Sequence, residues 1–417
     1  MRDTSWNWST RLVERFLTRP ARLSHLMERL PDSMDRGKRR RCQFLLYGVV
    51  RHLWLLESSV DAHLRKRPRP GLRSALLVAG FELLSEPDKK AQIVDHAVGE
   101  IGRRFSSGEK AMANAVLRKV GERLENLDRE STNSVAELAE KESHPEWLVR
   151  RWQESFGWEA ARKFTNWNQT EPEIYFLPIS AEAKEVGLES PWRPYRMVAK
   201  GDWPQIARLL DEGAVYVQDP GTRLGPEMLR KVFSEGRILD LCSAPGGKTI
   251  LFDKLFDERL EEIVSVDLPG PRFDRLRANM HRMGISRARP LASDIFQIDL
   301  AESGRFEGVY LDAPCSNTGV LQKKPDVKWR LTNDAMTELI ALQERMLAQA
   351  SLFTSPSGWL VYSTCSVETD ENESVVDRFL SSAAGGNFEL VEQIKNYPWE
   401  TGLDGAGVAL MQRVAGS

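Results

Sequence analysis

The second half of the chain alternates predicted strands with predicted helices, and this alternation most constrains the fold. From Arg237 onward, short apolar runs typical of buried strands are separated by segments with helical periodicity. A strand–helix–strand rhythm favours a doubly wound, mostly parallel sheet with helices on both faces. The expected strands are 237–242, 262–268, 288–293, 308–313, 359–364, 388–394 and 408–414, and the expected helices include 271–283, 334–353 and 371–380.

The N-terminal region, up to about residue 125, lacks this rhythm and is predicted to be helical throughout. Apolar residues recur there at spacings of three and four, as on the buried face of an amphipathic helix. We therefore expect a compact helical bundle with basic clusters at 38–41 and 65–67 on its rim. The helical spacing is clearest over 11–17, 43–60, 72–84, 93–101 and 111–124.

A chain of 417 residues is longer than one hydrophobic core usually organises, so several domains are expected. We predict an all-α domain over residues 1–140, a small mixed region over 141–218 and an α/β domain over 219–417. The polar stretch 126–142 is the expected connection between the first two. Six tryptophans between 147 and 203 could stack on nucleic-acid bases, but their spacing favours packing in a core or a domain interface.

Positive charge is concentrated near the N-terminus. Residues 1–120 hold 24 Lys and Arg against 13 Asp and Glu, a balance of +11, and the net charge of −2 for the chain leaves −13 for residues 121–417. A basic module on an otherwise acidic chain favours a polyanionic partner, with nucleic acid as the simplest one. A solvated basic surface without a partner would give the same count.

Two features lead us to expect a cytoplasmic protein. No apolar run approaches the ~20 residues that span a bilayer. The first 18 residues carry Asp3 and Glu14 and lack the apolar core of a signal peptide.

The four cysteines have none of the spacings of a zinc site, and the six histidines do not cluster near them, so we expect reduced thiols and no metal.

A glycine-rich turn follows the first predicted strand of the α/β domain. Its sequence is Cys242-Ser243-Ala244-Pro245-Gly246-Gly247-Lys248-Thr249, and it leads into a predicted helix. Such a turn lets the backbone approach a ligand and points the N–H groups of a helix start towards it. The ATP-binding pattern GxxxxGK followed by Ser or Thr requires glycine at position 242, where this chain has cysteine, so an ATP-hydrolysing P-loop is disfavoured.

Two acidic residues stand at the ends of the next two predicted strands. Asp267 closes the second strand, twenty residues after Gly247, where an acid binds ribose hydroxyls in sheets of this kind, and Asp294 closes the third. The dinucleotide pattern GxGxxG does not occur in the turn. A ribose-binding acid without that pattern favours an adenosine cofactor lacking phosphates, such as S-adenosylmethionine. Helix capping or loop hydrogen bonding is the alternative role for both carboxylates.

Two further strands each end at a cysteine. Cys315 follows the apolar run 309–313, and Cys365 follows 359–364. Ligands of open α/β sheets bind at the carboxyl ends of strands, so two thiols at this edge predict covalent chemistry on a substrate. A small buried hydrophobic residue is the more common role of a single cysteine, but it explains two of them poorly.

Three of these segments together resemble the signature motifs of the RNA cytosine-C5 methyltransferases. They are LDLCSAPGGKT over 239–249, LDAPCSNTG over 311–319 and YSTCS over 362–366, with PDVKW over 325–329 as a further similar stretch. The basic helical region is similar to the NusB-like RNA-binding domain that such enzymes carry. The resemblance implies a Rossmann-like methyltransferase domain, with a doubly wound, mostly parallel sheet, preceded by an all-α NusB-like domain and a small mixed linker domain.

The resemblance also implies the cofactor and the partners. S-adenosylmethionine is expected to bind at 242–248, Asp267, Asp294 and Asp312. RNA is the expected substrate, with 16S rRNA as the first candidate and tRNA as its nearest rival. A monomer without a metal or a membrane anchor is expected. An inactive RNA-binding factor of ribosome assembly is the alternative from another functional class.

Residue roles follow from the same resemblance and from the chemistry of the ring. C5 of cytosine is a poor nucleophile until a thiolate adds to C6, and a base must afterwards remove the C5 proton. The resemblance implies that Cys365 is the nucleophile and that Cys315 assists its release. Asp312 is expected to hydrogen-bond the cytosine near N3, and Lys248 either to lower a thiol pKa or to orient Asp312. Cys242 is expected to pack behind the turn, although the resemblance places it in the cofactor loop.

The chain departs from the family pattern in three places. The first is the segment Asp267-Leu268-Pro269-Gly270-Pro271, which puts two prolines and a glycine after the acid, where an ordinary helix start is expected. The pattern includes Gly-Phe-Phe near the C-terminus, where this chain has Gly405-Ala406-Gly407. Loss of the two aromatic residues is expected to change packing near the substrate or the cofactor. Residues 173–218 also match the family poorly, which leaves the RNA contacts of that region open.

Overall fold

The computed structural model describes residues 4–127 and 132–414. Two earlier expectations fall partly outside the described residues. Residues 1–3 begin the stretch expected to lack a signal peptide, and residues 128–131 belong to the predicted connection 126–142. The chain forms two compact units. The helical unit consists of Met1–Glu171 with Leu321–Leu331, and the sheet unit of Pro172–Val320 with Thr332–Ser417.

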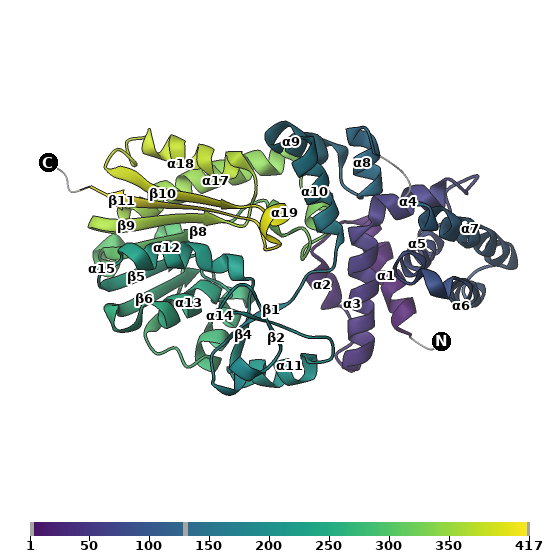
Figure 1. Ribbon diagram of the computed structural model, residues 1–417, viewed down its shortest axis with the longest axis horizontal. Coiled ribbons are helices and arrows are strands. Elements are labelled where there is room, and N and C mark those ends of the chain that lie inside the picture. Colours follow the sequence, from purple (N-terminus) through teal and green to yellow (C-terminus); the bar gives the residue numbers. More distant parts are fainter. Residues whose placement is uncertain (1–3, 128–131, 415–417) are drawn as a thin grey trace. The chain divides into compact units, whose positions relative to one another are not determined.

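The helical unit is built around α5 (Pro70–Ser85), whose residues are buried continuously from Leu72 to Leu83. A helix buried on every side needs apolar residues all round, and Leu, Ala and Val dominate this one. The predicted helical bundle is therefore confirmed. The other helices are α1 (Ser5–Thr18), α2 (Leu23–Met27), α3 (Arg36–Arg51), α4 (Leu53–Asp61), α6 (Lys90–Gly102), α7 (Ser107–Glu125), α8 (Val135–Lys141), α9 (Glu146–Phe156), α10 (Trp158–Gln169) and α16 (Val327–Arg330) (Figure 1).

The stretch 43–60, predicted to be helical from its spacing, is helical on both sides of one break. The structure has two helices, α3 and α4, which meet at His52, where φ is −104° and ψ is 23°. The Ser143 hydroxyl accepts hydrogen bonds from the N–H groups of Trp54 and Leu55, at 2.7 and 3.4 Å. This long-range contact satisfies donors at the start of α4. A residue 89 positions away supplies it, so the local periodicity gave no sign of the break.

The predicted connection 126–142 contains a helix, α8, in its described part. Ser134 begins it by accepting a hydrogen bond from the Glu137 N–H at 3.3 Å. Three apolar residues of the seven in α8 are buried. They are too few for a helical period to stand out in a polar stretch. The buried residues are Val135, Leu138 and Ala139, which pack with Trp54 and Trp158.

The packing role predicted for the tryptophans is confirmed for Trp152. It is fully buried, and its ring centroid lies 4.5 Å from that of Phe164. Trp203 differs, because 38% of it is exposed. Apolar packing therefore accounts for Trp152, whereas Trp203 keeps more than a third of its surface exposed.

The segment 321–331, from the second half of the chain, belongs to the helical unit. The Trp329 indole N–H donates to the carbonyl oxygen of Val50 at 2.7 Å, and Lys328 Nζ donates to that of Arg51 at 2.9 Å. Burial and the nearby charge of Arg51 lower the pKa of Lys328 well below its ordinary value. The PDVKW stretch that resembles the family is therefore anchored on α3.

The sheet unit begins with a small antiparallel sheet in the order β2-β3-β1-β4. The compact units therefore divide the predicted mixed region 141–218, because α9 and α10 lie in the helical unit and these strands in the sheet unit. The strands are β1 (Tyr175–Pro178), β2 (Leu188–Glu189), β3 (Arg196–Met197) and β4 (Val215–Val217).

The main sheet has seven strands in the order β10-β11-β9-β8-β5-β6-β7. The run from β9 to β7 is parallel, and β10 and β11 are antiparallel, so the predicted doubly wound, mostly parallel sheet is confirmed. The chain winds outward from β5 in both directions, which places the switch point for ligands at the carboxyl ends of β5 and β8. The strands are β5 (Gly236–Leu241), β6 (Leu260–Asp267), β7 (Ala288–Ala292), β8 (Phe306–Asp312), β9 (Thr354–Thr364), β10 (Phe388–Asn396) and β11 (Ala406–Arg413).

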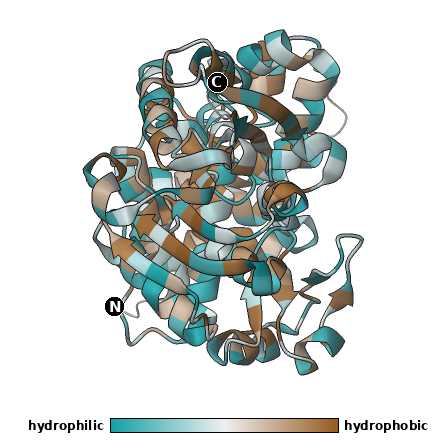
Figure 2. Ribbon diagram, turned by 90° about the vertical axis from the view of Figure 1, so that its left-hand side faces the viewer, coloured by the Kyte–Doolittle hydropathy of each residue, from teal (hydrophilic) through white to brown (hydrophobic). Residues whose placement is uncertain are grey.

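Alternate residues of the central strands face opposite helical layers. Leu239 and Leu241 of β5 belong to the core formed with α17 and α18, whereas Ile238 belongs to the core formed with α12 and α13. Figure 2 shows hydrophobic residues recurring along the strands and mixed colours along the helices, as two-sided packing requires. The helices of this unit are α11 (Trp203–Asp211), α12 (Leu224–Val232), α13 (Gly247–Leu255), α14 (Pro271–Arg282), α15 (Leu300–Ser303), α17 (Asn333–Leu352), α18 (Glu373–Leu380) and α19 (Pro398–Thr401).

The helix α17 has 20 residues, the length of a membrane span, but it is interrupted by charge. Asp334, Glu338, Glu344 and Arg345 all lie within it. Within 4–127 and 132–414, none of the helices combines the length and the apolar character needed to cross a membrane.

Candidate active site

The thiols of Cys315 and Cys365 lie 3.3 Å apart, sulfur to sulfur. Each follows the carboxyl end of a strand, β8 or β9, and these strands are parallel neighbours with Asp312 opposite Ser363. Two loops that leave adjacent strand ends therefore meet, although their cysteines are 50 residues apart in the sequence. The structure brings together the two residues that the sequence placed at separate strand ends.

The two thiols differ in environment. Cys315 is only 7% exposed, whereas Cys365 is half-buried. The Cys365 thiol can donate to the amide oxygen of Asn317 at 3.4 Å, and the Asn317 amide donates to the carbonyl oxygen of Cys315 at 2.7 Å. The hydrogen bond with Cys365, burial and the charge that Cys365 can carry raise the pKa of Cys315 well above its ordinary value. Cys315 therefore keeps its proton and can donate it towards the sulfur of Cys365.

The carboxylate of Asp312 is held from two sides. Lys248 Nζ lies 2.6 Å from Asp312 Oδ2, and the Ser363 hydroxyl donates to Oδ1 at 3.0 Å. Burial opposes the charge of Lys248, but the attraction of Asp312 and of nearby acidic groups outweighs it and raises the pKa of Lys248. Of the two roles considered for Lys248, the contact with Asp312 is the one that this geometry provides.

The glycine-rich turn is fixed by hydrogen bonds to its backbone. Asp267, the last residue of β6, accepts the N–H of Ala244 at 2.9 Å with Oδ2 and the N–H of Leu268 at 2.9 Å with Oδ1. Arg272 and Asn279 of α14 donate to the carbonyl oxygens of Ala244 and Pro245, at 2.6 and 2.7 Å. The Ser243 hydroxyl donates to Val266 O at 3.1 Å. The predicted loop and the predicted ribose-binding acid thus lie side by side.

Four residues of the cofactor prediction have local roles as well. Gly246 has a φ of 105°, which favours glycine, and Gly247 begins α13. Cys242, with φ 61°, packs against the core beneath the turn, and burial raises its pKa. Asp294 accepts a hydrogen bond from the Phe296 N–H at 3.0 Å, which is the loop-capping alternative considered for it.

A buried carboxylate, Glu371, was not anticipated from the sequence. It is fully buried, and its Oε1 accepts hydrogen bonds from the Ser316 N–H at 2.8 Å and from the Gln343 amide at 2.9 Å. Its Oε2 accepts from the Ser316 hydroxyl. Gln343 also donates to the carbonyl oxygen of Pro314 at 2.9 Å. Glu371 and Gln343 therefore fix the loop that carries Cys315.

Asn372 performs the same task for the loop that carries Cys365. Its amide donates to the carbonyl oxygens of Ser366 and Glu368, at 3.1 and 2.8 Å, and its Oδ1 accepts from the Thr364 hydroxyl at 2.7 Å. The Ser366 hydroxyl lies 3.2 Å from that of Ser316 in the other loop. The run Glu371-Asn372-Glu373 begins the predicted helix 371–380, and its charged side chains gave no signal of this buried network.

The departure at 405–407 has a packing reason. Gly405 N–H donates to Gly319 O at 2.8 Å, so the two backbones touch. A Cβ at Gly319 would lie 2.7 Å from Gly405 O, and one at Gly407 would lie 2.1 Å from Asn372 Oδ1. A side chain at either glycine would displace the loops that carry the thiols.

No metal site emerges from the described part of the chain. Within residues 4–127 and 132–414, no three His, Cys, Asp or Glu side chains gather as ligands of one ion. The acidic side chains at the strand ends are bound instead to Lys248 and to backbone N–H groups.

Two regions of the chain match known families. Residues 228–402 match the family described as 16S rRNA methyltransferase RsmB/F, and residues 19–122 match the NusB family. Ribosomal RNA small subunit methyltransferase B of Photorhabdus laumondii is 27% identical over 391 residues, 89% of each chain. The protein of the same name from Klebsiella pneumoniae is 28% identical over 400 residues, 88% of each chain.

Solved structures share the fold. The protein PH0851 is 22% identical with a TM-score of 0.74 over 99% of both chains. A methyltransferase homologue from Pyrococcus horikoshii is 21% identical with a TM-score of 0.58, and covers 68% of this chain and 100% of its own. NSun6 from the same organism, solved with SFG, is 18% identical with a TM-score of 0.56 over 66% of this chain and 100% of its own. The chain therefore contains an RsmB/F-family methyltransferase region over 228–402, preceded by a NusB-family region over 19–122, and the solved structures show that the fold is shared.

Proposed function

We propose that this enzyme methylates C5 of a cytosine in RNA, with S-adenosylmethionine as methyl donor and 16S rRNA as the first candidate substrate. The observation that carries the proposal is the pair of thiols 3.3 Å apart at the ends of β8 and β9. Transfer to a nucleophilic oxygen or nitrogen needs no such pair. Addition to a ring carbon followed by elimination needs a nucleophile and a base.

The environment of Cys365 supports the role of nucleophile. It is the more exposed of the two thiols, and Cys315 can donate a hydrogen bond to it. The deprotonated sulfur adds to C6 of the cytosine, and the electron pair of the C5–C6 double bond becomes available at C5. S-adenosylmethionine, when bound, supplies an electrophilic methyl group on a sulfonium. C5 would form the new bond to that methyl carbon while the methyl–sulfonium bond breaks, with its electron pair leaving on the sulfur as a neutral thioether.

Asp312 supports the addition through the ring nitrogen. Attack at C6 is easier when N3 carries a proton, because the ring then accepts the electron pair without building up negative charge. The Asp312 carboxylate, fixed by Lys248 and Ser363, can accept a hydrogen bond from the protonated N3 or from the exocyclic amine. A fixed acceptor also selects cytosine by its donor pattern.

Bond formation at Cys365 changes the state of Cys315. In the free enzyme, the hydrogen bond with Cys365, burial and the charge of Cys365 raise the pKa of Cys315. Once Cys365 is bonded to C6 it carries no charge, so two of these three influences weaken and the pKa of Cys315 falls. Cys315 then releases its own proton to solvent, and the resulting thiolate can take the C5 proton. The S–C6 bond breaks, its electron pair leaves with sulfur, and the C5–C6 double bond re-forms.

The residues at the strand ends fit an adenosine cofactor without phosphates. Each oxygen of Asp267 accepts one backbone N–H, which leaves lone pairs for ribose hydroxyls. Gly246 gives the turn its left-handed backbone, with φ of 105°, and Lys248 is paired with Asp312 rather than free for a phosphate. The likeness in fold to NSun6, solved with SFG, an S-adenosylmethionine analogue, gives indirect support.

The names of the relatives and the NusB-family region support 16S rRNA as the substrate. An enzyme that adds a thiol to C6 must reach the face of the base, so we expect an unpaired cytosine in a loop or bulge. A ribosomal substrate would place the enzyme in the cytoplasm.

The test combines the purified protein, S-adenosylmethionine and unmodified 16S rRNA, followed by bisulfite sequencing, in which 5-methylcytosine resists conversion. We expect one protected cytosine with the wild type and with Cys42→Ala, a thiol control in the helical unit, and none with Cys365→Ala. Protection of tRNA alone would replace the substrate. RNA binding without methyl transfer to any RNA would overturn the catalytic proposal in favour of an assembly factor.

A further inference from the structure

The loop between α4 and α5 carries three cations without a partner in the described part of the chain. Arg65, Lys66 and Arg67 are exposed, and none makes an ion pair or a hydrogen bond with any residue that the structure describes. Unpaired cations next to one another repel, which a protein tolerates at a surface that meets an anion.

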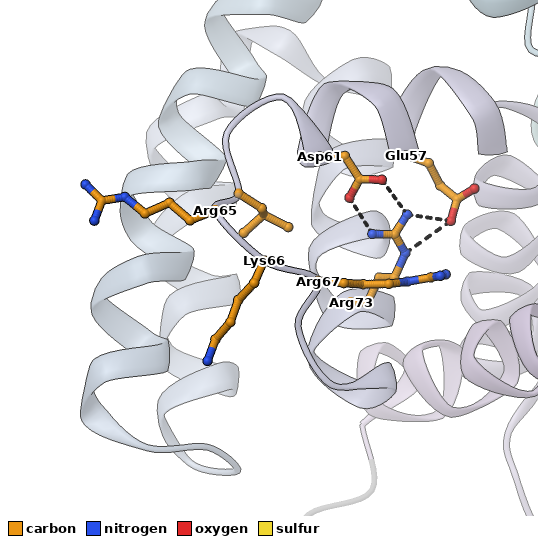
Figure 3. Close-up of a pocket in the computed structure, with 7 residues that line it drawn as sticks. Glu57, Asp61, Arg65, Lys66, Arg67 and Arg73 are labelled. Carbon is orange, nitrogen blue, oxygen red and sulfur yellow. Dashed lines mark hydrogen bonds and ion pairs between the residues drawn. The ribbon is translucent and has the colours of Figure 1, made fainter.

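The carboxylates nearest to this loop are already occupied. Glu57 and Asp61 hold the buried guanidinium of Arg73, with Glu57 Oε1 and Asp61 Oδ2 at 2.7 and 2.9 Å from Arg73 Nη2. Figure 3 shows these contacts, and it shows Arg65 and Lys66 extending away from the cluster. The charge of the loop is therefore not neutralised by its acidic neighbours.

A cavity of about 660 Å³ lies between the same loop and α7. Its rim is cationic, because Lys119 also makes no ion pair among the described residues, and Glu109 is held by Arg69 through hydrogen bonds of 2.8 and 2.6 Å. His63 Nε2 is buried there without a hydrogen-bond partner in the described structure. The apolar part of the wall consists of Leu64, Pro68, Leu72, Met112, Ala115 and Val116.

An apolar cavity with a cationic rim matches the chemistry of an unpaired nucleotide. A splayed-out base can lie against aliphatic side chains and guanidinium planes, while its phosphates contact the cations. The volume is within the range of small-ligand sites. An acidic peptide would also bind the cations, but it would leave the apolar wall without a partner.

We propose that the 62–69 loop and α7 form an RNA-docking site, which holds an unpaired nucleotide of the substrate with its phosphates on Arg65, Lys66 and Arg67. The inference rests on the proposed function, since it takes RNA as the substrate. It assigns the RNA contact to the 62–69 loop and α7 of the helical unit, whereas the chemistry takes place in the sheet unit.

The first test removes the charge. In the loop variant, Arg65, Lys66 and Arg67 are changed together to Gln. In the control variant, three other exposed cations of the same unit, Arg22, Arg36 and Arg40, are changed to Gln. Binding of unmodified 16S rRNA is measured at several salt concentrations. We expect the loop variant to weaken binding about tenfold or more near 0.1 M salt, and the slope of log affinity against log salt to fall by about 2, since each single-strand phosphate contact contributes about 0.7.

The second test fills the cavity without changing charge. Ala115→Trp places a large side chain at the cavity wall, and Ala91→Trp, on the exposed part of α6, is its control. We expect weaker RNA binding with the first variant, an unchanged salt slope, and wild-type binding with the control. Circular dichroism and thermal unfolding confirm that each variant is folded.

The outcomes separate this inference from the proposed function. If the wild type methylates RNA, and the loop variant and its control bind RNA with equal affinity, the docking site is overturned and the proposed function stands. A different result assigns the loop to an acidic protein instead. In that case the loop variant loses affinity for RNA, poly-glutamate lowers the affinity of the wild type to the same extent, and Ala115→Trp has no effect. A wild-type protein that neither binds nor methylates RNA overturns both proposals.

Discussion

The Glu371 carboxylate accepts hydrogen bonds from both the backbone N–H and the hydroxyl of Ser316, the residue that follows Cys315. A buried acid thus fixes the backbone that presents one of the two thiols. Each hydrogen bond to a buried charged group contributes about 1.5–3 kcal/mol. The sulfur–sulfur distance of 3.3 Å therefore depends on a residue that touches neither sulfur.

Glu371→Gln should impair this positioning. The variant has one acceptor oxygen where the carboxylate has two, so one contact with Ser316 or Gln343 is lost. We expect a loss of about 2 kcal/mol in the free energy of unfolding and a lower kcat, with KM for S-adenosylmethionine unchanged. Urea unfolding and steady-state kinetics provide both measurements. Asp377→Asn, an exposed change on α18, is the control, and a Glu371→Gln enzyme with wild-type kcat would contradict the positioning role.

Cys315→Ala should separate addition from release. Cys365 can still add to C6, but the group that takes the C5 proton is missing, so the S–C6 bond persists. We expect a protein–RNA complex that survives denaturing electrophoresis in the presence of S-adenosylmethionine. Cys365→Ala should give none, and Cys42→Ala should turn over normally. A Cys315→Ala enzyme that releases methylated RNA at the wild-type rate would show that another group removes the proton.

The main sheet was predictable because its strands are locally encoded. Every predicted strand from 237–242 to 408–414 occurs in the structure, with ends shifted by a few residues, since apolar runs and turn residues mark strands within a short window. The break at His52 and the placement of 321–331 were not predictable. Both depend on partners far away in the sequence, Ser143 for the first and α3 for the second.

The candidate site was predictable in its reactive groups and not in their supports. Cys315, Cys365 and Asp312 stand at strand ends, where the sequence pattern reveals them. Glu371 and Asn372 follow in a charged stretch, and charge in a sequence ordinarily indicates a solvated surface. Their burial follows from hydrogen bonds to loop backbones, which no periodicity records.

The contacts of Asp312 predict that removing either of its two partners lowers the catalytic efficiency, to different extents. Lys248→Met removes a charged partner and leaves Ser363 as the hydrogen-bond donor to this carboxylate within the described structure, so kcat/KM for RNA should fall on the order of 100-fold. Ser363→Ala removes a neutral hydrogen bond and should reduce it about tenfold or less. Steady-state kinetics with both substrates varied separates the effects. A defect of Lys248→Met confined to KM for S-adenosylmethionine would assign Lys248 to the cofactor instead.

Asp240, next to the carboxyl end of β5, predicts a pH dependence of stability. The residue is fully buried, its Oδ2 accepts a hydrogen bond from Thr249 at 2.6 Å, and its Oδ1 has no partner among the described residues. Burial raises the pKa of Asp240 to about 7, against the hydrogen bond of Thr249 and the charge of Lys248, which lower it. An unfolded chain would ionise this group near pH 4.

Between about pH 4 and pH 7 the folded protein therefore holds a proton on Asp240 that the unfolded chain has released. Stability is lost as the pH rises through this window, by roughly 4 kcal/mol at most for a shift of this size. Asp240→Asn cannot ionise, so its stability relative to the wild type should improve from pH 5 to pH 7 and then level off. Urea unfolding at four values of pH, with exposed Glu258→Gln as the control, measures the difference. Parallel curves for the wild type and Asp240→Asn would show that Asp240 is ionised in the folded enzyme throughout.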